Sequence, residues 1–307
     1  MSDLLLHPEH TREPQQASFS DESNPIGLDG IEFIEYATLK PQALGHVLEM
    51  MGFLPVARHR SREVTRYRQG KLNIIVNAHP LDALGAGRGT EQPSISAMAL
   101  RVRNARAARE YMLARGAWEV PGHPDAMELN IPAIHGVGGS RIYLIDRYQE
   151  FSIYDVDFIP IPGAAAQPSL LGDVNYFGVV QYIGPGRSND WIEFYQTLLG
   201  ATLIDDRQRF GIMPSGQLMR LPSIADGQSF MLQLVEPAID VSDPREHLQR
   251  IGLGVPDVLA AVRALRARGV EFVESDATHT EQRGAITKTY LGSVLFELVH
   301  ATPLSAP

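Results

Sequence analysis

One acidic residue interrupts an apolar stretch near the end of the chain. The run Leu291–His300 reads LGSVLFELVH, which is typical of a buried strand, and carries Glu297 near its centre. A carboxylate in a core strand is costly to bury unless a cation, a hydrogen bond or a metal ion compensates for it. The alternative is a strand at a sheet edge, with the carboxylate in water. The first interpretation predicts that another part of the chain supplies a partner for Glu297.

The composition limits the partners and the chemistry of the chain. Its 307 residues are 44% hydrophobic and 21% charged, which is enough for two domains with cores of their own. The formal net charge of −9 and the lack of a dense Lys/Arg cluster argue against nucleic acid. Because cysteine is absent, the possible metal ligands are His, Asp and Glu. No signal peptide or membrane-length apolar run appears, so we expect a cytoplasmic protein with no membrane partner.

The same order of strands and helix recurs four times. The first copy is predicted as a strand, a helix and three strands, at 30–36, 41–51, 54–59, 64–69 and 72–77. Pro41 opens its helix and Gly52 ends it. The second copy is predicted as a strand, a helix capped by Asn104 and closed by Gly116, and later strands, at 94–102, 104–116, 142–145 and 151–156.

Two more copies follow in the second half. The third is predicted as a strand, a helix stopped by Gly200 and a last strand, at 173–182, 189–199 and 232–235. The fourth is predicted as a strand at 248–255, a helix between Pro256 and Gly269, and the strand that carries Glu297. Each copy therefore has the pattern of a strand–helix–strand–strand–strand unit.

Four such units, paired two and two, predict an α+β fold of two similar domains with curled mixed sheets and helices outside. The domains are expected at 24–160 and 171–302, joined by a Pro/Ala/Gly-rich linker at 161–170. The polar residues 1–23 are expected to form a mobile tail. Concave sheets are natural small-molecule sites, so a binding cavity follows from this architecture.

Several segments of the N-terminal half resemble one known family. They are NPIGLDGIEFIEY (24–36), MGF (51–53), RHRSR (58–62), YRQG (67–70), MELNIPAIHGVGG (127–139), IYLIDRY (142–148) and IYDVDF (153–158). Together they are similar to the N-terminal domain of bacterial 4-hydroxyphenylpyruvate dioxygenases, and the C-terminal half follows the family more loosely. The resemblance implies the vicinal oxygen chelate fold of the glyoxalase/bleomycin resistance/dioxygenase superfamily.

In that family the N-terminal domain is a structural copy, and two His and one Glu of the C-terminal domain hold Fe(II). Matched residue by residue, the Glu falls on Glu297, the first His on Tyr176 and the second on Arg250. Arginine has no lone pair to offer a metal, and a neutral tyrosine is a poor ligand for Fe(II). The resemblance therefore predicts a degenerate iron site with no cofactor, in which Glu297 is the remaining metal ligand if a metal is bound.

The residues at this site suggest three functions. In the first, Arg250 binds the carboxylate or keto oxygen of a small anionic or aromatic 2-oxo acid, with Gln249 and Tyr176 as polar contacts. If catalysis survives, Glu297 as base and Tyr176 as acid would enolise, dehydrate or isomerise a keto compound. The structural alternative is an internal Arg250–Glu297 salt bridge that fills a vacated metal site.

The second function is an Fe(II)-dependent 2-oxo acid dioxygenase with unorthodox ligands, and the third is a non-catalytic scaffold or assembly partner. Oxygen uptake that disappears on chelation distinguishes the second from the others. Whether the chain is an enzyme at all stays open at this point. In each case we expect a homo-oligomer.

Overall fold

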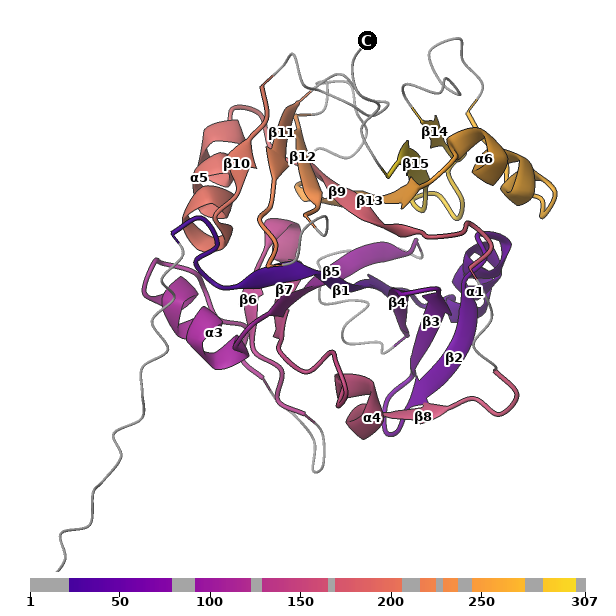
Figure 1. Ribbon diagram of the computed structural model, residues 1–307, viewed down its shortest axis with the longest axis horizontal. Helices are drawn as coiled ribbons and strands as arrows, with labels where there is room; N and C mark the ends of the chain where they lie inside the picture. Colours follow the sequence, from indigo (N-terminus) through magenta and orange to yellow (C-terminus); the bar gives the residue numbers. More distant parts are fainter. Residues whose placement is uncertain are drawn as a thin grey trace, which may run out of the picture.

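Two curled β-sheets with helices at their flanks make up the computed structural model (Figure 1). The structure describes residues 22–78, 92–122, 129–164, 169–205, 216–224, 229–236, 245–273 and 284–301. Most of the predicted tail, 1–21, and the middle of the predicted linker, 165–168, lie outside these ranges. Within them, no helix has the length and apolar character needed to cross a membrane.

The first domain contains an eight-stranded sheet in the order β6-β7-β5-β1-β4-β3-β2-β8. Its strands are β1 (Leu28–Ala37), β2 (Leu54–His59), β3 (Val64–Gln69), β4 (Leu72–Asn77), β5 (Ser94–Val102), β6 (Ala133–His135), β7 (Arg141–Ile145) and β8 (Phe158–Pro160). Its helices are α1 (Pro41–Met50), α3 (Ala105–Leu113), the 3-10 turn η1 (Val137–Gly139) and α4 (Ile153–Asp157). The sheet is mixed, because β1 runs parallel to β4 and antiparallel to β5.

The second domain contains a seven-stranded sheet in the order β10-β11-β12-β9-β13-β15-β14. Its strands are β9 (Asn175–Tyr182), β10 (Thr202–Leu203), β11 (Gln217–Arg220), β12 (Met231–Val235), β13 (His247–Val255), β14 (Ala285–Ile286) and β15 (Phe296–His300). Its helices are α5 (Ser188–Leu199) and α6 (Val258–Arg266). Read from opposite ends, the two sheets have the same order, so β1, β5 and β7 correspond to β9, β13 and β15. The predicted α+β fold with two curled mixed sheets is confirmed.

Local signals begin and end the helices. The Asn104 side chain accepts a hydrogen bond from the Ala107 amide at 2.9 Å and caps α3. The helix predicted to open at Pro256 instead begins at Val258, with Asp257 as its cap through the Ala260 amide at 2.8 Å. Gly200 ends α5 in the left-handed conformation, with φ of 69°.

One predicted strand, at 151–156, is wrong, because the structure has the short helix α4 there. Ser152 and Asp155 form a capping box, in which the carboxylate of Asp155 accepts the backbone N–H and the hydroxyl of Ser152, at 2.8 and 3.0 Å. This local hydrogen bonding satisfies the first turn of a helix. It outweighs the alternation of polar and apolar residues on which the strand prediction rested.

The two sheets lie one above the other in Figure 1, and one apolar core contains residues of both. Ile34 and Leu100 of the first sheet and Ile251 and Leu298 of the second belong to this core. Because side chains alternate along a strand, the intervening residues point to the outer face of each sheet. These outer faces carry smaller apolar clusters, which contain Phe33, Ile75 and Phe158 in the first domain and Ile204, Leu218 and Met231 in the second. Each domain therefore has a hollow that faces away from the shared core.

Candidate functional site

Arg250 and Glu297 lie on the face of the second sheet that is turned away from the shared core. Their neighbours Ile251, Phe296 and Leu298 lie in the shared core, so strand alternation directs Arg250 and Glu297 to the outer face. The strands β13 and β15 run parallel and side by side, which brings the two side chains together.

The two side chains form a buried ion pair. Arg250 Nε donates to Glu297 Oε2 at 2.9 Å, and the side chains are 2% and 6% exposed. Arg250 Nη1 donates to Gln249 Oε1 at 3.0 Å. The third nitrogen, Nη2, is buried and has no hydrogen-bond partner among the described residues. The structure thus supplies the partner that the sequence demanded for Glu297, and leaves one guanidinium nitrogen to be satisfied.

A small cavity lies beside Glu297, and Arg250 is not among the residues that line it. It has a volume of about 30 Å³ and lies beside Glu297, Gly178, Gly252 and Met231. Gly178, Gly252 and Glu297 stand in one row across β9, β13 and β15. Because two of the three residues in this row have no side chain, space remains beside the carboxylate. The space is enough for a water molecule or for one polar group of a ligand.

Tyr176 lies on the opposite face of the sheet from the ion pair. Its ring belongs to the shared core, and its hydroxyl donates to the backbone carbonyl of Asn73 in the first domain. Burial, with a further contribution from the charge of Glu32, raises the pKa of the Tyr176 hydroxyl far above its ordinary value. Tyr176 is therefore a neutral donor within the domain interface. The sequence did not indicate Asn73 as its partner, because the two residues are 103 positions apart.

The residues at these positions do not fit Fe(II). Arg250 has no lone pair to donate, its Nε occupies one carboxylate oxygen of Glu297, and Tyr176 faces away. Within the described ranges, no three or more His, Asp and Glu side chains are grouped so that they would hold a metal ion. The interaction that the structure shows at this site is the Arg250–Glu297 ion pair.

Two family models match the chain. Residues 22–159 match the N-terminal domain of hydroxyphenylpyruvate dioxygenase. Residues 182–293 match the glyoxalase/bleomycin resistance protein/dioxygenase superfamily. The first matched range covers the first domain, and the second lies within the second domain.

Individual proteins match over most of the chain. A 4-hydroxyphenylpyruvate dioxygenase of Pseudomonas aeruginosa is 34% identical over 275 residues, which are 85% of this chain and 76% of the relative. A solved fusion of a xylose isomerase-like TIM barrel with a 4-hydroxyphenylpyruvate dioxygenase aligns at a TM-score of 0.70 and 22% identity, over 90% of this chain and 49% of the fusion. A 4-hydroxymandelate synthase variant from Streptomyces coelicolor aligns at a TM-score of 0.65 and 17% identity, over 90% and 93% of the two chains. At these identities, the two structures support the fold alone.

Proposed function

This chain belongs to the 4-hydroxyphenylpyruvate dioxygenase family of the vicinal oxygen chelate superfamily, and from this premise we propose that its C-terminal domain binds a small 2-oxo acid through Arg250, without Fe(II). One observation carries the proposal. The guanidinium of Arg250 is buried, yet its Nη2 has no hydrogen-bond partner among the described residues. A carboxylate or keto oxygen is the acceptor that this nitrogen lacks.

The energetics favour an anionic acceptor. A buried donor without an acceptor costs about 1–3 kcal/mol, and a hydrogen bond between charged groups contributes about 1.5–3 kcal/mol. Glu297 keeps the cation neutralised while no ligand is bound, at an Nε–Oε2 distance of 2.9 Å. An anion that approaches Nη2 therefore meets a guanidinium that is already oriented by Glu297 and Gln249.

The size of the cavity limits which part of the ligand enters. The cavity of about 30 Å³ beside Glu297 has room for about one small polar group, and such a group reaches Nη2 of the buried Arg250 only if neighbouring side chains move. Tyr176 takes no part in this proposal, because its hydroxyl is engaged with Asn73 on the other face. The proposal thus assigns anion binding to the site and no proton transfer.

The test measures binding of phenylpyruvate by calorimetry, together with iron content by mass spectrometry after anaerobic Fe(II) loading and desalting. We expect the parent to retain no stoichiometric iron and to bind phenylpyruvate. Arg250→Met should weaken binding at least about 10-fold, which corresponds to about 1.4 kcal/mol. Arg263→Met is the matched control, since Arg263 is an exposed arginine on α6 of the same domain.

The variant Glu297→Gln distinguishes a ligand-binding role of Arg250 from a salt bridge that only fills the site. This change keeps Arg250 but removes the carboxylate that competes with the ligand, so we expect tighter binding. About one iron per chain in the parent would instead favour the oxygenase function with unorthodox ligands. Full binding in Arg250→Met would refute the assignment of Arg250. If phenylpyruvate neither binds nor raises the melting temperature, the scaffold function takes its place.

A further inference from the structure

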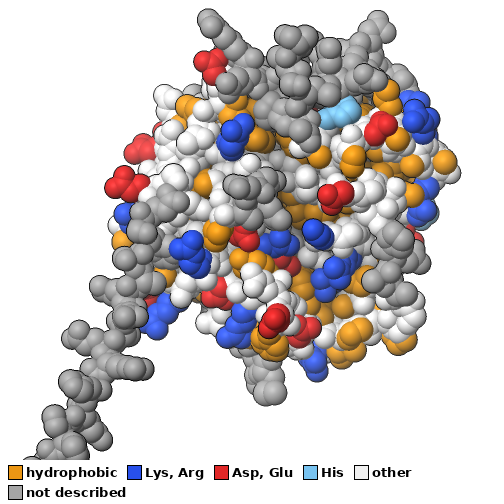
Figure 2. Space-filling model, in the orientation of Figure 1, with side chains coloured by type: hydrophobic (Ala, Val, Ile, Leu, Met, Phe, Trp, Pro, Cys, Tyr) orange, Lys and Arg blue, Asp and Glu red, His pale blue; other side chains and the backbone are white. Residues whose placement is uncertain are grey.

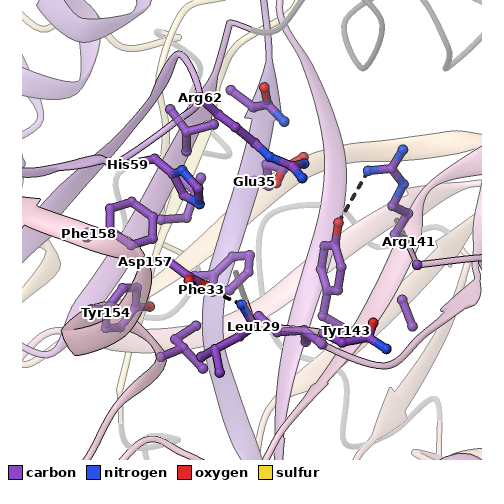
Figure 3. A pocket seen from close by; sticks show the side chains of 18 of the residues that line it. Phe33, Glu35, His59, Arg62, Leu129, Arg141, Tyr143, Tyr154, Asp157 and Phe158 are labelled. Carbon is purple, nitrogen blue, oxygen red and sulfur yellow. Dashed lines mark hydrogen bonds between the residues drawn. The ribbon is translucent and has the colours of Figure 1, made fainter. Parts of the chain in front are cut away.

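The hollow of the first domain is a second candidate binding site. A cavity of about 300 Å³ lies there, which is within the range of small-molecule sites. Most of its lining residues lie on the strands β1, β2, β4 and β7, on the helix α4 and in the segments 120–122 and 129–131, and Figure 3 shows many of their side chains. The repeated architecture predicts a cavity, but the family resemblance treats this domain as a structural copy, so no ligand was expected here.

Two alanines of β5 separate side chains of β1 and β7 that line the cavity. Glu35 of β1, Ala97 of β5 and Arg141 of β7 form one row across three neighbouring strands. Neighbouring strands are about 4.8 Å apart, so Glu35 and Arg141 stand about 10 Å apart, with only a methyl group between them. The next row has the same arrangement, with Ala99 as its middle residue. In this second row the rings of Phe33 and Tyr143 meet across Ala99, with their centroids 6.0 Å apart.

Charged side chains line one end of this cavity. Figure 3 shows Arg62 and Arg141 entering from opposite sides, with Glu35 beside Arg62. Glu35 is 7% exposed and accepts a hydrogen bond from the Ser96 hydroxyl at 2.7 Å. Arg141 Nη1 donates to the Tyr143 hydroxyl at 3.3 Å. Two guanidinium groups and one carboxylate leave a net positive charge at this end, which favours an anionic group.

The other end of the cavity is aromatic and apolar. Phe33, Phe158 and Ile153 line it, and the ring centroids of Phe33 and Tyr143 are 6.0 Å apart. Asp157 lies between these side chains (Figure 3) and is 7% exposed. Its Oδ1 accepts the Leu129 amide at 3.2 Å and can also accept a hydroxyl from a ligand.

The cavity uses the same part of the fold as the site in the second domain. Because β1, β5 and β7 correspond in sheet order to β9, β13 and β15, Arg141 lies on the strand that corresponds to that of Glu297. In both domains, small residues occupy the middle strand of the row and a charged residue stands on the strand beyond it. The two hollows therefore differ in lining and volume and share one geometry.

We propose that the hollow of the N-terminal domain binds a small aromatic carboxylic acid with a hydroxyl group on its ring. The carboxylate lies between Arg62 and Arg141, the ring packs against Phe33 and Phe158, and the hydroxyl donates to Asp157. This site is separate from the one at Arg250, since the two hollows face away from each other across the shared core.

The test uses 4-hydroxyphenylacetate as the probe, with phenylacetate and tyramine as analogues that lack the hydroxyl and the carboxylate. Calorimetry should give a dissociation constant below about 1 mM for the probe. Arg141→Met and Arg62→Met should each weaken its binding at least about 10-fold. The parent protein should bind tyramine no more tightly than the two arginine variants bind 4-hydroxyphenylacetate. Arg106→Met is the control, because Arg106 lies on α3 of the same domain with its side chain 88% exposed.

Two further readouts locate the ligand. Asp157→Asn preserves the shape of the cavity and should abolish the preference for 4-hydroxyphenylacetate over phenylacetate. In amide spectra, the probe should shift the signals of the lining residues Glu35, Tyr143 and Leu129 and leave that of Gly252 unchanged. The proposal is overturned if the probe does not bind below about 1 mM, or if its binding survives both arginine variants. Loss of binding in Arg250→Met with shifts confined to Gly252 overturns it as well, and supports the C-terminal site instead.

Discussion

Replacing Arg250 by methionine should destabilise the C-terminal domain far more than a change at a surface ion pair of the same length. The Arg250–Glu297 pair has an N–O distance of 2.9 Å, with side chains 2% and 6% exposed. The Arg106–Glu110 pair has a distance of 3.0 Å, with side chains 88% and 57% exposed. Since the distances are nearly equal, the difference between the two pairs is the hydration of the carboxylate that each replacement leaves behind.

The expected magnitudes follow from that difference. Arg250→Met leaves the carboxylate of Glu297 buried without its cation, which costs about 3–5 kcal/mol of unfolding free energy. Arg106→Met leaves Glu110 in water and costs about 0.3–0.5 kcal/mol. The double variant Arg250→Met/Glu297→Leu removes both charges, so its stability should return to that of the parent or rise by about 1–4 kcal/mol.

Urea unfolding followed by tryptophan fluorescence measures these values. Trp191 of α5 is 8% exposed and reports on the C-terminal domain, whereas Trp118 is 78% exposed. A Trp118→Phe background therefore isolates the signal of Trp191. A loss below about 1 kcal/mol in Arg250→Met, or a double variant as unstable as the single one, would refute the assignment of a desolvated ion pair.

Three further changes test other parts of the structure. Gly200→Ala should lower stability by more than about 1–2 kcal/mol in thermal unfolding, because φ is +69° and a Cβ would come 2.7 Å from Pro25 Cδ; an unchanged melting temperature would contradict this. Tyr176→Phe removes the hydrogen bond to Asn73 and should cost about 0.5–1.5 kcal/mol without changing phenylpyruvate binding. The hydroxyl and amide groups at the start of α5 lower the pKa of Glu236, so its stabilising contribution is complete above the unfolded pKa of about 4.3 and is lost as the pH falls through the lower folded value. The difference in unfolding free energy between the parent and Glu236→Gln should therefore be constant above about pH 5.5 and should become smaller as the pH falls below about 4. A difference that does not change with pH would contradict the lowered pKa.

Local signals in the sequence predicted most of the elements. Pro41, Gly52, Asn104 and Gly200 act through their own backbone and side-chain geometry, so the ends of the helices can be read without knowledge of distant residues. The short helix α4 was missed because its capping box competes with an equally local strand pattern. At this segment the hydrogen bonds of the capping box outweigh the alternation of polar and apolar residues.

The sequence by itself predicted the repeated units and a partner for Glu297, and the family resemblance led to the hypothesis of an altered iron site. The tertiary structure decided which residues meet. A β-bulge at Gly252/Leu253 shifts the pairing of β9 and β13 by one residue. Because a shift of one residue exchanges the two faces of a strand, Tyr176 points into the shared core instead of toward the face of Gly178. The cavity of the first domain depends on the register that aligns Glu35, Ala97 and Arg141. Such registers join strands far apart in the sequence, so no local pattern contains them.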